Sequence, residues 1–248
     1  MVEMIPTTIN ERWTLLLPEH RAARTEWPVW EKERLAAMSD CIRPGDVVYD
    51  IGAEEGDFPC LWASWGASVV LVEPNPRVWP NIKAIFEANQ LDGRVLGVWV
   101  GFAGDPSTER FSVSWWEEHC ARPDGDLWPK CAYGPGIGDH GFLGLPERPD
   151  CPSTTIDFMA LHYGAPTVIT IDVEGAELTV LRGANRALTE NRPRVFVSVH
   201  QDLPFIDEKY PGDTEERVFE YMEALGYTGT RLALDHELHV EFAHPEGR

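Results

Sequence analysis

Apolar runs and amphipathic spacings alternate along the first half of the chain. Short β-branched runs predict buried strands at residues 47–51, 68–73 and 95–100. Phe58, Leu61, Trp62 and Trp65 follow the i, i+3, i+4, i+7 spacing of an amphipathic helix, and residues 78–89 predict another. Strands that are apolar on both faces and alternate with helices indicate an α/β fold with a mostly parallel sheet, covered by helices on both faces.

The alternation breaks at residues 102–151, which are rich in glycine, proline and aromatic residues, and then resumes. Helices are predicted at 155–163, 175–188 and 214–225, with strands at 167–172 and 195–200. Two alternating segments, 227–234 and 237–242, predict an antiparallel pair at the sheet edge and bring the total to seven strands. We therefore predict an N-terminal helical cap at 1–44, with its helix at about 30–41, and a single domain at 45–248 with an insertion at about 102–151.

The charge of the chain narrows the choice of partners. Its 248 residues include 21 Lys and Arg against 41 Asp and Glu, a net charge of −20. Nucleic-acid binders gain affinity from Lys and Arg that displace counterions, so neither nucleic acid nor an anionic membrane is expected as a partner. No signal peptide or membrane span is predicted, and five cysteines without a disulfide-framework pattern indicate reduced thiols in a cytoplasmic protein.

The turn after the first predicted strand carries the strongest local signal. Its sequence, Asp50-Ile-Gly-Ala-Glu-Glu-Gly56, stands at a strand-to-helix junction, where the two glycines would let the backbone pass close to a ligand. Glu73 ends the next strand, where a carboxylate can accept hydrogen bonds from ribose hydroxyls. Glu54 occupies the place of the second glycine of a dinucleotide motif, and acids at 54 and 55 would repel a pyrophosphate. S-adenosylmethionine therefore fits this turn better than NAD does.

A second acidic turn follows the strand at 167–172. Asp172 and Glu174 flank the expected site, whereas Glu177 is interpreted as a first-turn acid that favours the helix N-terminus. His200 ends the neighbouring strand and is a candidate general base.

The segments 48–56, 71–76 and 171–183 resemble the FkbM family of S-adenosylmethionine-dependent methyltransferases, and the resemblance extends over about residues 44–203. Its most specific part is Asp172-Val-Glu-Gly175 followed by Leu181-Arg-Gly183. The resemblance implies a class I methyltransferase fold and O-methylation of a hydroxyl on a sugar, a glycosylated acceptor or a natural-product-like molecule. It places Asp50, Gly52 and Gly56 at the methionine end of the cofactor, and Glu73 at its ribose. The predicted cofactor site comprises Asp50, Gly52, Ala53, Glu54, Gly56, Glu73, Pro74 and Gly101.

Two positions depart from the family pattern. The family often has Asn at the position of Glu54, and often has Glu two residues before the His that ends the fifth strand, where this chain has Ser198. The second departure weakens any catalytic role transferred to that strand.

The insertion at 102–151 falls at the edge of the sheet where an acceptor must enter. Its aromatic residues could stack on the faces of a sugar or could form a small satellite core under a substrate lid. They are Phe102, Phe111, Trp115, Trp116, Trp128, Tyr133 and Phe142. The histidines and cysteines of the insertion match no zinc spacing.

Methyl transfer to a hydroxyl needs a base or a metal that acidifies the hydroxyl. Asp172, Glu174 and His200 are the predicted catalytic residues, and Asp172 with His200 could alternatively hold Mg²⁺. The main rival is a catalytically degenerate scaffold with the same fold. A nicotinamide-dependent oxidoreductase and a nucleic-acid methyltransferase are the others, and the sequence leaves the oligomeric state open.

Overall fold

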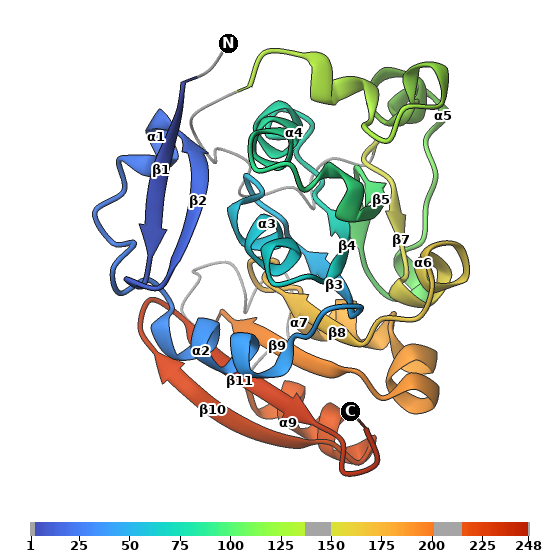
Figure 1. Ribbon diagram of the computed structural model, residues 1–248. Helices are drawn as coiled ribbons and strands as arrows, with labels where there is room; N and C mark the ends of the chain where they lie inside the picture. The colour runs from blue at the N-terminus through green and yellow to red at the C-terminus, as the bar shows by residue number, and fades with distance from the viewer. Residues whose placement is uncertain (1–2, 137–149, 201–214, 248) are drawn as a thin grey trace.

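A seven-stranded sheet forms the centre of the protein. The computed structural model describes residues 3–136, 150–200 and 215–247. From one edge to the other the strands are β10 (Thr228–Leu234), β11 (Leu238–Ala243), β9 (Arg194–Val199), β8 (Val168–Ile171), β3 (Val47–Ile51), β4 (Ser68–Val72) and β5 (Val95–Trp99). Figure 1 follows this sheet from the red C-terminal strands to green β5. β11 runs antiparallel to both of its neighbours, whereas the other pairs are parallel. The predicted mostly parallel sheet with an antiparallel C-terminal edge is confirmed.

Helices cover both faces of the sheet because successive strand residues point to opposite sides. Val48 and Val69 pack into one core cluster, whereas Tyr49 and Val70 pack into the other. The first cluster contains buried side chains of α2 (Lys32–Cys41), α3 (Asp57–Ser64) and α4 (Trp79–Ala88). The second contains those of α6 (Ile156–Tyr163), α7 (Glu177–Arg182) and α9 (Glu215–Ala224).

The N-terminal segment is not the all-helical cap that we predicted. β1 (Met4–Ile9) and β2 (Trp13–Pro18) form an antiparallel hairpin, and the short α1 (Glu19–Ala22) follows before α2. Asn10 and Glu11 adopt positive φ in the connecting turn, which allows the tight reversal. Ile9, Leu15 and Leu17 are buried in the same cluster as α3 and α4, so the hairpin belongs to the core on that side of the sheet.

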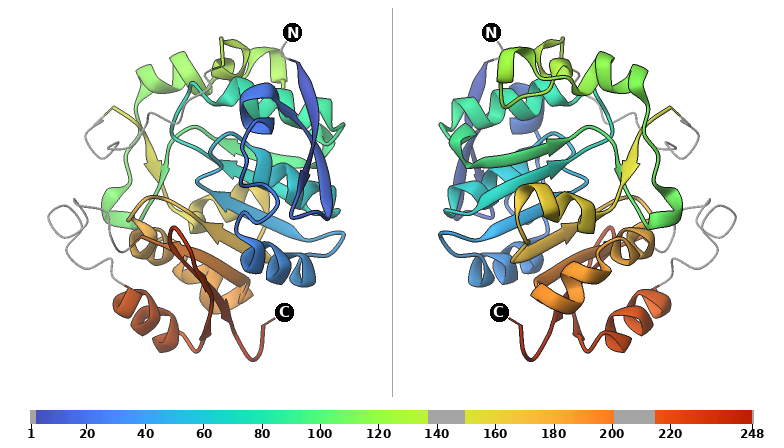
Figure 2. Two further views of the ribbon diagram at one scale, coloured as in Figure 1. Left: turned by 90° about the vertical axis from the view of Figure 1, so that its left-hand side faces the viewer. Right: turned by 90° about the vertical axis from the view of Figure 1, so that its right-hand side faces the viewer.

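The insertion contains only short elements in its described part. They are β6 (Phe102–Ala103), α5 (Val113–Trp115), a π-helical turn at Trp116–Cys120, and 3-10 turns at Pro106–Thr108, Pro123–Gly125 and Lys130–Tyr133. β7 (Ser153–Thr154) follows the insertion and pairs with β6. Both views of Figure 2 place the yellow-green helical turns of the insertion at the opposite end of the molecule from the red C-terminal strands. A 3-10 turn at Asp92–Arg94 precedes β5.

The aromatic residues of the insertion divide into two groups. Trp115 and Trp128 are each 3% exposed and pack into the core, and Trp115 Nε1 donates to the Val100 carbonyl at 3.0 Å. Phe111 and Tyr133 are more than half exposed. The two buried tryptophans therefore pack inward, but into a main core cluster and not into a separate satellite core, while Phe142 lies outside the described residues.

α7 ends earlier than the predicted helix at 175–188. It stops at Arg182, and a π-helical turn at Ala187–Asn191 follows. A Cβ at Gly183 would lie 1.9 Å from the Gly104 carbonyl oxygen, so the chain here packs directly against the insertion.

Two global expectations can be compared with the structure. None of the five cysteines forms a disulfide bond. Among the described residues, no helix has both the length and the apolar character that a bilayer crossing requires.

Candidate active site

The predicted site residues meet at the carboxyl edge of the parallel strands. Asp50 is the fourth residue of β3, and Glu73, Asp172 and His200 directly follow β4, β8 and β9. Because β11 runs antiparallel, its first residue lies at the same edge, and Leu238 pairs with Val199. The turn between β10 and β11 therefore brings Glu237 to His200, a contact that we did not predict from the sequence.

The glycines of the cofactor turn are required by packing within the protein. Gly52 has φ of 93°, and a Cβ there would lie 1.8 Å from the Asp172 carbonyl oxygen. Gly56 has φ of 92°, and its Cβ would lie 3.0 Å from Ile82. The glycines thus let β3, β8 and α4 approach one another, whereas the sequence had suggested close approach to a ligand. Ala53, between them, is buried.

Glu73 is fixed by two backbone donors. The Glu54 N–H donates to its Oε2 at 3.1 Å, and the Asn75 N–H donates to its Oε1 at 2.6 Å. Its burial, with only 8% exposed, raises its pKa to about 8, and the two backbone hydrogen bonds oppose that rise. Glu73 therefore lies beside the glycine turn, as predicted, and further hydrogen-bond donors would stabilise its charged form.

Asp50 is buried next to the aromatic core. The Trp62 indole N–H donates to its Oδ1 at 3.1 Å. Burial raises the pKa of Asp50 to about 7, which the hydrogen bond from Trp62 and the charge of Arg34 partly offset. Its carboxyl group thus forms a second titratable group at the predicted cofactor edge.

The two acids of the turn are paired with the N-terminal segment. Glu54 forms ion pairs with Arg21 at 3.0 Å and Arg24 at 3.5 Å. Glu55 is fully buried and contacts His20 Nε2 at 2.5 Å. Because Glu54 is ion-paired with two arginines and Glu55 is held by His20, the electrostatic argument that these acids repel a pyrophosphate is weakened.

Pro74 and Gly101 complete the predicted cofactor residues. Pro74 separates Glu73 from Asn75, the residue whose N–H binds Glu73. A Cβ at Gly101 would lie 2.6 Å from the Pro152 carbonyl oxygen, so this glycine lets the start of the insertion pack against its return.

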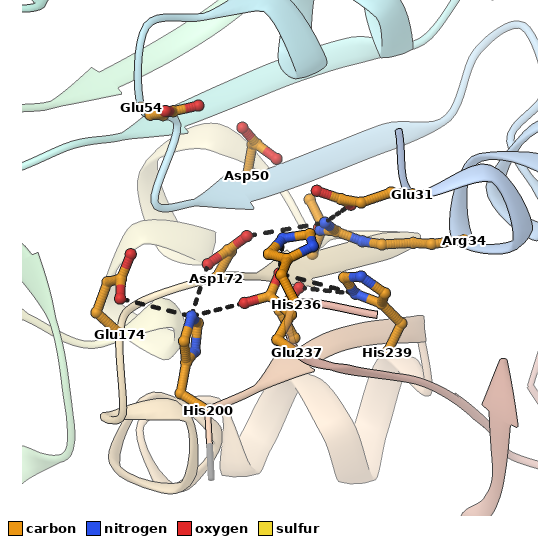
Figure 3. A network of polar contacts seen from close by, with 12 residues as sticks. Glu31, Arg34, Asp50, Glu54, Asp172, Glu174, His200, His236, Glu237 and His239 are labelled. Atoms are coloured by element: carbon orange, nitrogen blue, oxygen red, sulfur yellow. Dashed lines mark hydrogen bonds and ion pairs between the residues drawn. The ribbon is translucent and has the colours of Figure 1, made fainter. Parts of the chain in front are cut away.

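His200 is held between the carboxylates of Glu177 and Glu237, and Figure 3 shows its contact with Glu237. Its Nδ1 is 2.9 Å from Glu177 Oε1, and its Nε2 is 2.6 Å from Glu237 Oε2. Burial alone would lower the pKa of His200, but the hydrogen bonds to Glu177 and Glu237 outweigh it and raise the pKa to about 11. These contacts favour the protonated form of the ring, which could not accept a proton. The arrangement thus does not favour His200 as general base, and that role stays a prediction.

Glu177 does more than favour a helix N-terminus. It is fully buried, and its Oε1 accepts a hydrogen bond from the Gly175 N–H at 2.9 Å in addition to contacting His200. It therefore connects the acidic turn to the end of β9. Its position as the first residue of α7 gave no sequence signal for this contact.

Asp172 and Glu174 are the accessible acids of this edge. The Asp172 side chain is 31% exposed and its Oδ1 lies 3.8 Å from His200 Nε2. Glu174 is 50% exposed, 3.5 Å from the same nitrogen, and has φ of 56°, a conformation that residues with a Cβ seldom adopt. Burial raises the pKa of both carboxyl groups, and Glu237 raises that of Asp172 further while His200 opposes the rise.

Arg34 of α2 supplies a buried cation beside Asp172. It forms an ion pair with Glu31, donates to Thr170 Oγ1 at 2.6 Å, and lies 3.8 Å from Asp172 Oδ2. Figure 3 shows this group on the opposite side of Asp172 from His200. Neither Arg34 nor Glu31 was predicted, because α2 lies more than 130 residues before Asp172.

The ligand atoms of Asp172, Glu174 and His200 lie within 4.8 Å of one another, so the predicted Mg²⁺ site at Asp172 and His200 stays a prediction. A metal ligand needs a free nitrogen lone pair, and both nitrogens of His200 lie close to carboxylates that compete for them. A neighbouring cluster of Glu31, His236, Glu237 and His239 also brings ligand atoms within 4.8 Å of one another. In this cluster Arg34 already forms an ion pair with Glu31, so the positive charge that balances Glu31 comes from Arg34.

The order of the strands and the antiparallel β11 are those of the class I methyltransferase fold that the sequence predicts. The family model described as Methyltransferase FkbM domain matches residues 143–228. The resemblance found in the sequence is thus confirmed by this match.

Relatives and solved structures are similar at low identity. The chain is 26% identical over 182 residues to the hexuronic acid methyltransferase AglP of Haloferax volcanii, covering 69% of this chain and 66% of that protein. It therefore spans slightly less than two thirds of this curated relative. A crystal structure of the methyltransferase FkbM from Methylobacillus flagellatus is 17% identical, with a TM-score of 0.48 over 80% of this chain and 43% of that one. A precorrin-6Y C5,15-methyltransferase from Geobacter metallireducens is 13% identical, with a TM-score of 0.48 over 89% of each chain.

Proposed function

We propose that the protein transfers a methyl group from S-adenosylmethionine to a hydroxyl of a sugar or glycosylated acceptor. The observation that carries this proposal is the joint placement of Glu73, beside the glycine turn, and of Asp172, beside His200, at one edge of the sheet. The methyltransferase domain of the chain and a relative named for hexuronic acid support the reaction class and a carbohydrate acceptor.

The cofactor residues fit S-adenosylmethionine in their chemistry. Glu73 would accept the ribose hydroxyls, since its carboxylate is buried and charged donors or hydroxyls would stabilise its ionised form. Asp50, with Gly52 and Gly56 shaping the turn, would line the methionine end. When bound, the cofactor supplies an electrophilic methyl group and leaves as S-adenosylhomocysteine.

Asp172 is the proposed proton acceptor. A hydroxyl is a poor nucleophile until its proton is removed, and a base works best when its pKa is near the working pH. The raised pKa of Asp172 and its 31% exposure suit it to take the acceptor proton as the oxygen attacks the methyl carbon. His200 and Arg34 would then hold Asp172 from two sides as fixed cations.

A hydroxyl suits the site better than an acceptor carboxylate. Around Asp172, the described cations are already paired: Arg34 with Glu31, and His200 with Glu177 and Glu237. An incoming carboxylate would instead face the accessible acids Asp172 and Glu174. No divalent ion is needed in the proposed reaction, because Asp172 is the group proposed to take the proton of the acceptor hydroxyl.

The test is methyl transfer from methyl-labelled S-adenosylmethionine to a panel of neutral glycosides and uronic acid glycosides. Labelled neutral glycoside is the expected product. Asp172→Asn should lower kcat by about 10²-fold or more, the usual contribution of a general base, while S-adenosylhomocysteine affinity changes little. Asp40→Asn, an exposed acid on α2, is the matched control.

Two results would count against the proposal. An Asp172→Asn enzyme with unchanged kcat would remove Asp172 as the base. Cofactor binding without turnover on any glycoside would favour the scaffold alternative. Five cysteines that form no disulfide support the further proposal of a reducing, cytoplasmic location.

A further inference from the structure

A buried arginine from the N-terminal segment reaches the cofactor turn. Arg21 of α1 is 2% exposed. Its Nη2 donates to Asp57 Oδ2 at 2.6 Å and to Glu54 Oε2 at 3.0 Å, and its Nη1 donates to Glu54 Oε1 at 3.2 Å. Glu54 and Asp57 stand on either side of Gly56, so a single guanidinium connects both ends of the turn.

The contact with Glu54 bears on the ribose site. Glu54 has φ of 49°, a left-handed conformation that is unfavourable for a residue with a Cβ. In this conformation its N–H points to Glu73 Oε2 at 3.1 Å. Arg21 binds both carboxylate oxygens of Glu54 and thereby holds the residue whose backbone orients Glu73.

Arg21 is itself held firmly in place. The Trp27 indole N–H donates to the Arg21 carbonyl at 2.8 Å, and the guanidinium lies 5.8 Å from the centre of the Trp27 ring. The neighbouring His20 contacts Glu55, which also accepts a hydrogen bond from Asn81 Nδ2 at 2.8 Å. The N-terminal segment therefore binds Glu54 and Glu55, two consecutive acids of the turn.

We propose that Arg21 is a positioning residue of the cofactor site. It fixes the turn in the conformation that orients the Glu54 N–H and Glu73 towards the ribose, although it touches neither cofactor nor acceptor. The inference rests on the proposed function, because it requires that this turn binds S-adenosylmethionine. It makes the N-terminal hairpin segment, which precedes the family match at 143–228, a part of the cofactor site.

The test is a double-mutant cycle read by calorimetric binding of S-adenosylhomocysteine to the full chain. Arg21→Gln should weaken binding about tenfold, on the order of one lost charge-assisted hydrogen bond, and Arg21→Lys should weaken it less because one cationic contact survives. Glu54→Gln, at an acid that is 43% exposed, should weaken binding without a large loss of fold stability. Arg21→Gln combined with Glu54→Gln should bind no worse than Arg21→Gln alone, since both changes break the same contact.

Arg12→Gln is the matched control. It makes the same change in the same hairpin segment, where Arg12 is exposed and bonds to Ser39 Oγ at 3.3 Å. Its affinity should stay within about twofold of the wild-type value. Unfolding midpoints of all variants are measured in parallel, so that affinities are compared only where each variant is folded.

The outcomes separate the two proposals. If wild-type protein binds S-adenosylhomocysteine and both Arg21→Gln and Glu54→Gln bind it equally well, Arg21 serves stability alone and the inference is overturned. Additive losses in the double variant would also overturn it, because Arg21 would then act by a route other than Glu54. If the wild-type protein binds no S-adenosylhomocysteine, the proposed function itself fails and the inference fails with it.

Discussion

Glu73→Gln is the perturbation that most sharply tests the cofactor site. Both oxygens of Glu73 accept backbone N–H groups, from Glu54 at 3.1 Å and from Asn75 at 2.6 Å. Glutamine offers one acceptor oxygen and places an NH₂ group against the other donor. A hydrogen bond to a charged group contributes about 1.5–3 kcal/mol, so S-adenosylhomocysteine should bind roughly ten- to a hundredfold more weakly.

The pH dependence of S-adenosylhomocysteine binding provides a second test of Glu73. Burial raises the pKa of Glu73 to about 8, so the carboxyl is mostly protonated at neutral pH in the free protein. Ribose hydroxyls donate to the ionised form, and binding should therefore release a proton. Affinity should rise roughly tenfold per pH unit below pH 8 and level off above it. The same raised pKa lowers the free energy of unfolding as pH rises from the ordinary pKa of Glu towards 8, because over this range Glu73 is protonated in the folded state and ionised in the unfolded chain.

The assay is calorimetry at several pH values and in buffers of different ionisation enthalpy. Asp50, whose pKa is raised to about 7, also titrates at this edge, and Glu73→Gln retains that contribution. The difference between wild type and Glu73→Gln therefore isolates Glu73. Equal affinity in the two proteins, or the same pH slope in both, would refute the ribose assignment.

Three further outcomes follow from the geometry. Gly52→Ala places a Cβ 1.8 Å from the Asp172 carbonyl oxygen at positive φ, so it should lower the free energy of unfolding by about 2 kcal/mol or more in urea titrations. Gly93→Ala, with open space around it, should change that free energy little, and equal effects of the two substitutions would contradict the packing argument. The His200 ring should stay doubly protonated in NMR titrations from about pH 6 to 9, because its pKa is raised to about 11, and the stability from this charge is lost only as pH rises through that value. Glu237→Gln should lower the pKa of His200, and an unchanged pKa would show that the 2.6 Å contact between the two side chains is unimportant. Arg34→Met should lower the free energy of unfolding by about 3–5 kcal/mol, because it leaves Glu31 as a buried unpaired charge. Adding Glu31→Gln to this variant should recover part of the lost stability, and no recovery would mean that the broken ion pair is not the cause of the loss.

The sheet could be predicted because its strands carry their pattern locally. Residues 47–51 and 227–242 needed only short apolar or alternating runs to be assigned, and both predictions match the strands found. The N-terminal hairpin was missed because its turn depends on positive φ at Asn10 and Glu11, which are not glycine. The end of the helix after 175 was missed because Gly183 meets Gly104, a contact between distant parts of the chain.

The site was predictable to the extent that it lies at strand ends. Glu73, Asp172 and His200 follow from the rule that functional groups gather at the carboxyl edge of parallel strands. Their protonation could not be predicted, because the charge of His200 depends on Glu177 and Glu237, and the latter arrives on the returning β11. The pairing of Glu54 with Arg21 was likewise invisible, since the two residues are 33 positions apart on separate elements.

The most direct measurement of the central claim is thermal unfolding with S-adenosylmethionine, S-adenosylhomocysteine and NADH in parallel. A ligand at a hundredfold excess over its Kd stabilises the native state by about 2.7 kcal/mol, which for a chain of this size raises the midpoint by roughly 5 to 10 °C. We predict such a rise with both sulfur compounds and none with NADH. No rise with either sulfur compound, or a rise with NADH alone, would contradict the assignment of this edge as an S-adenosylmethionine site.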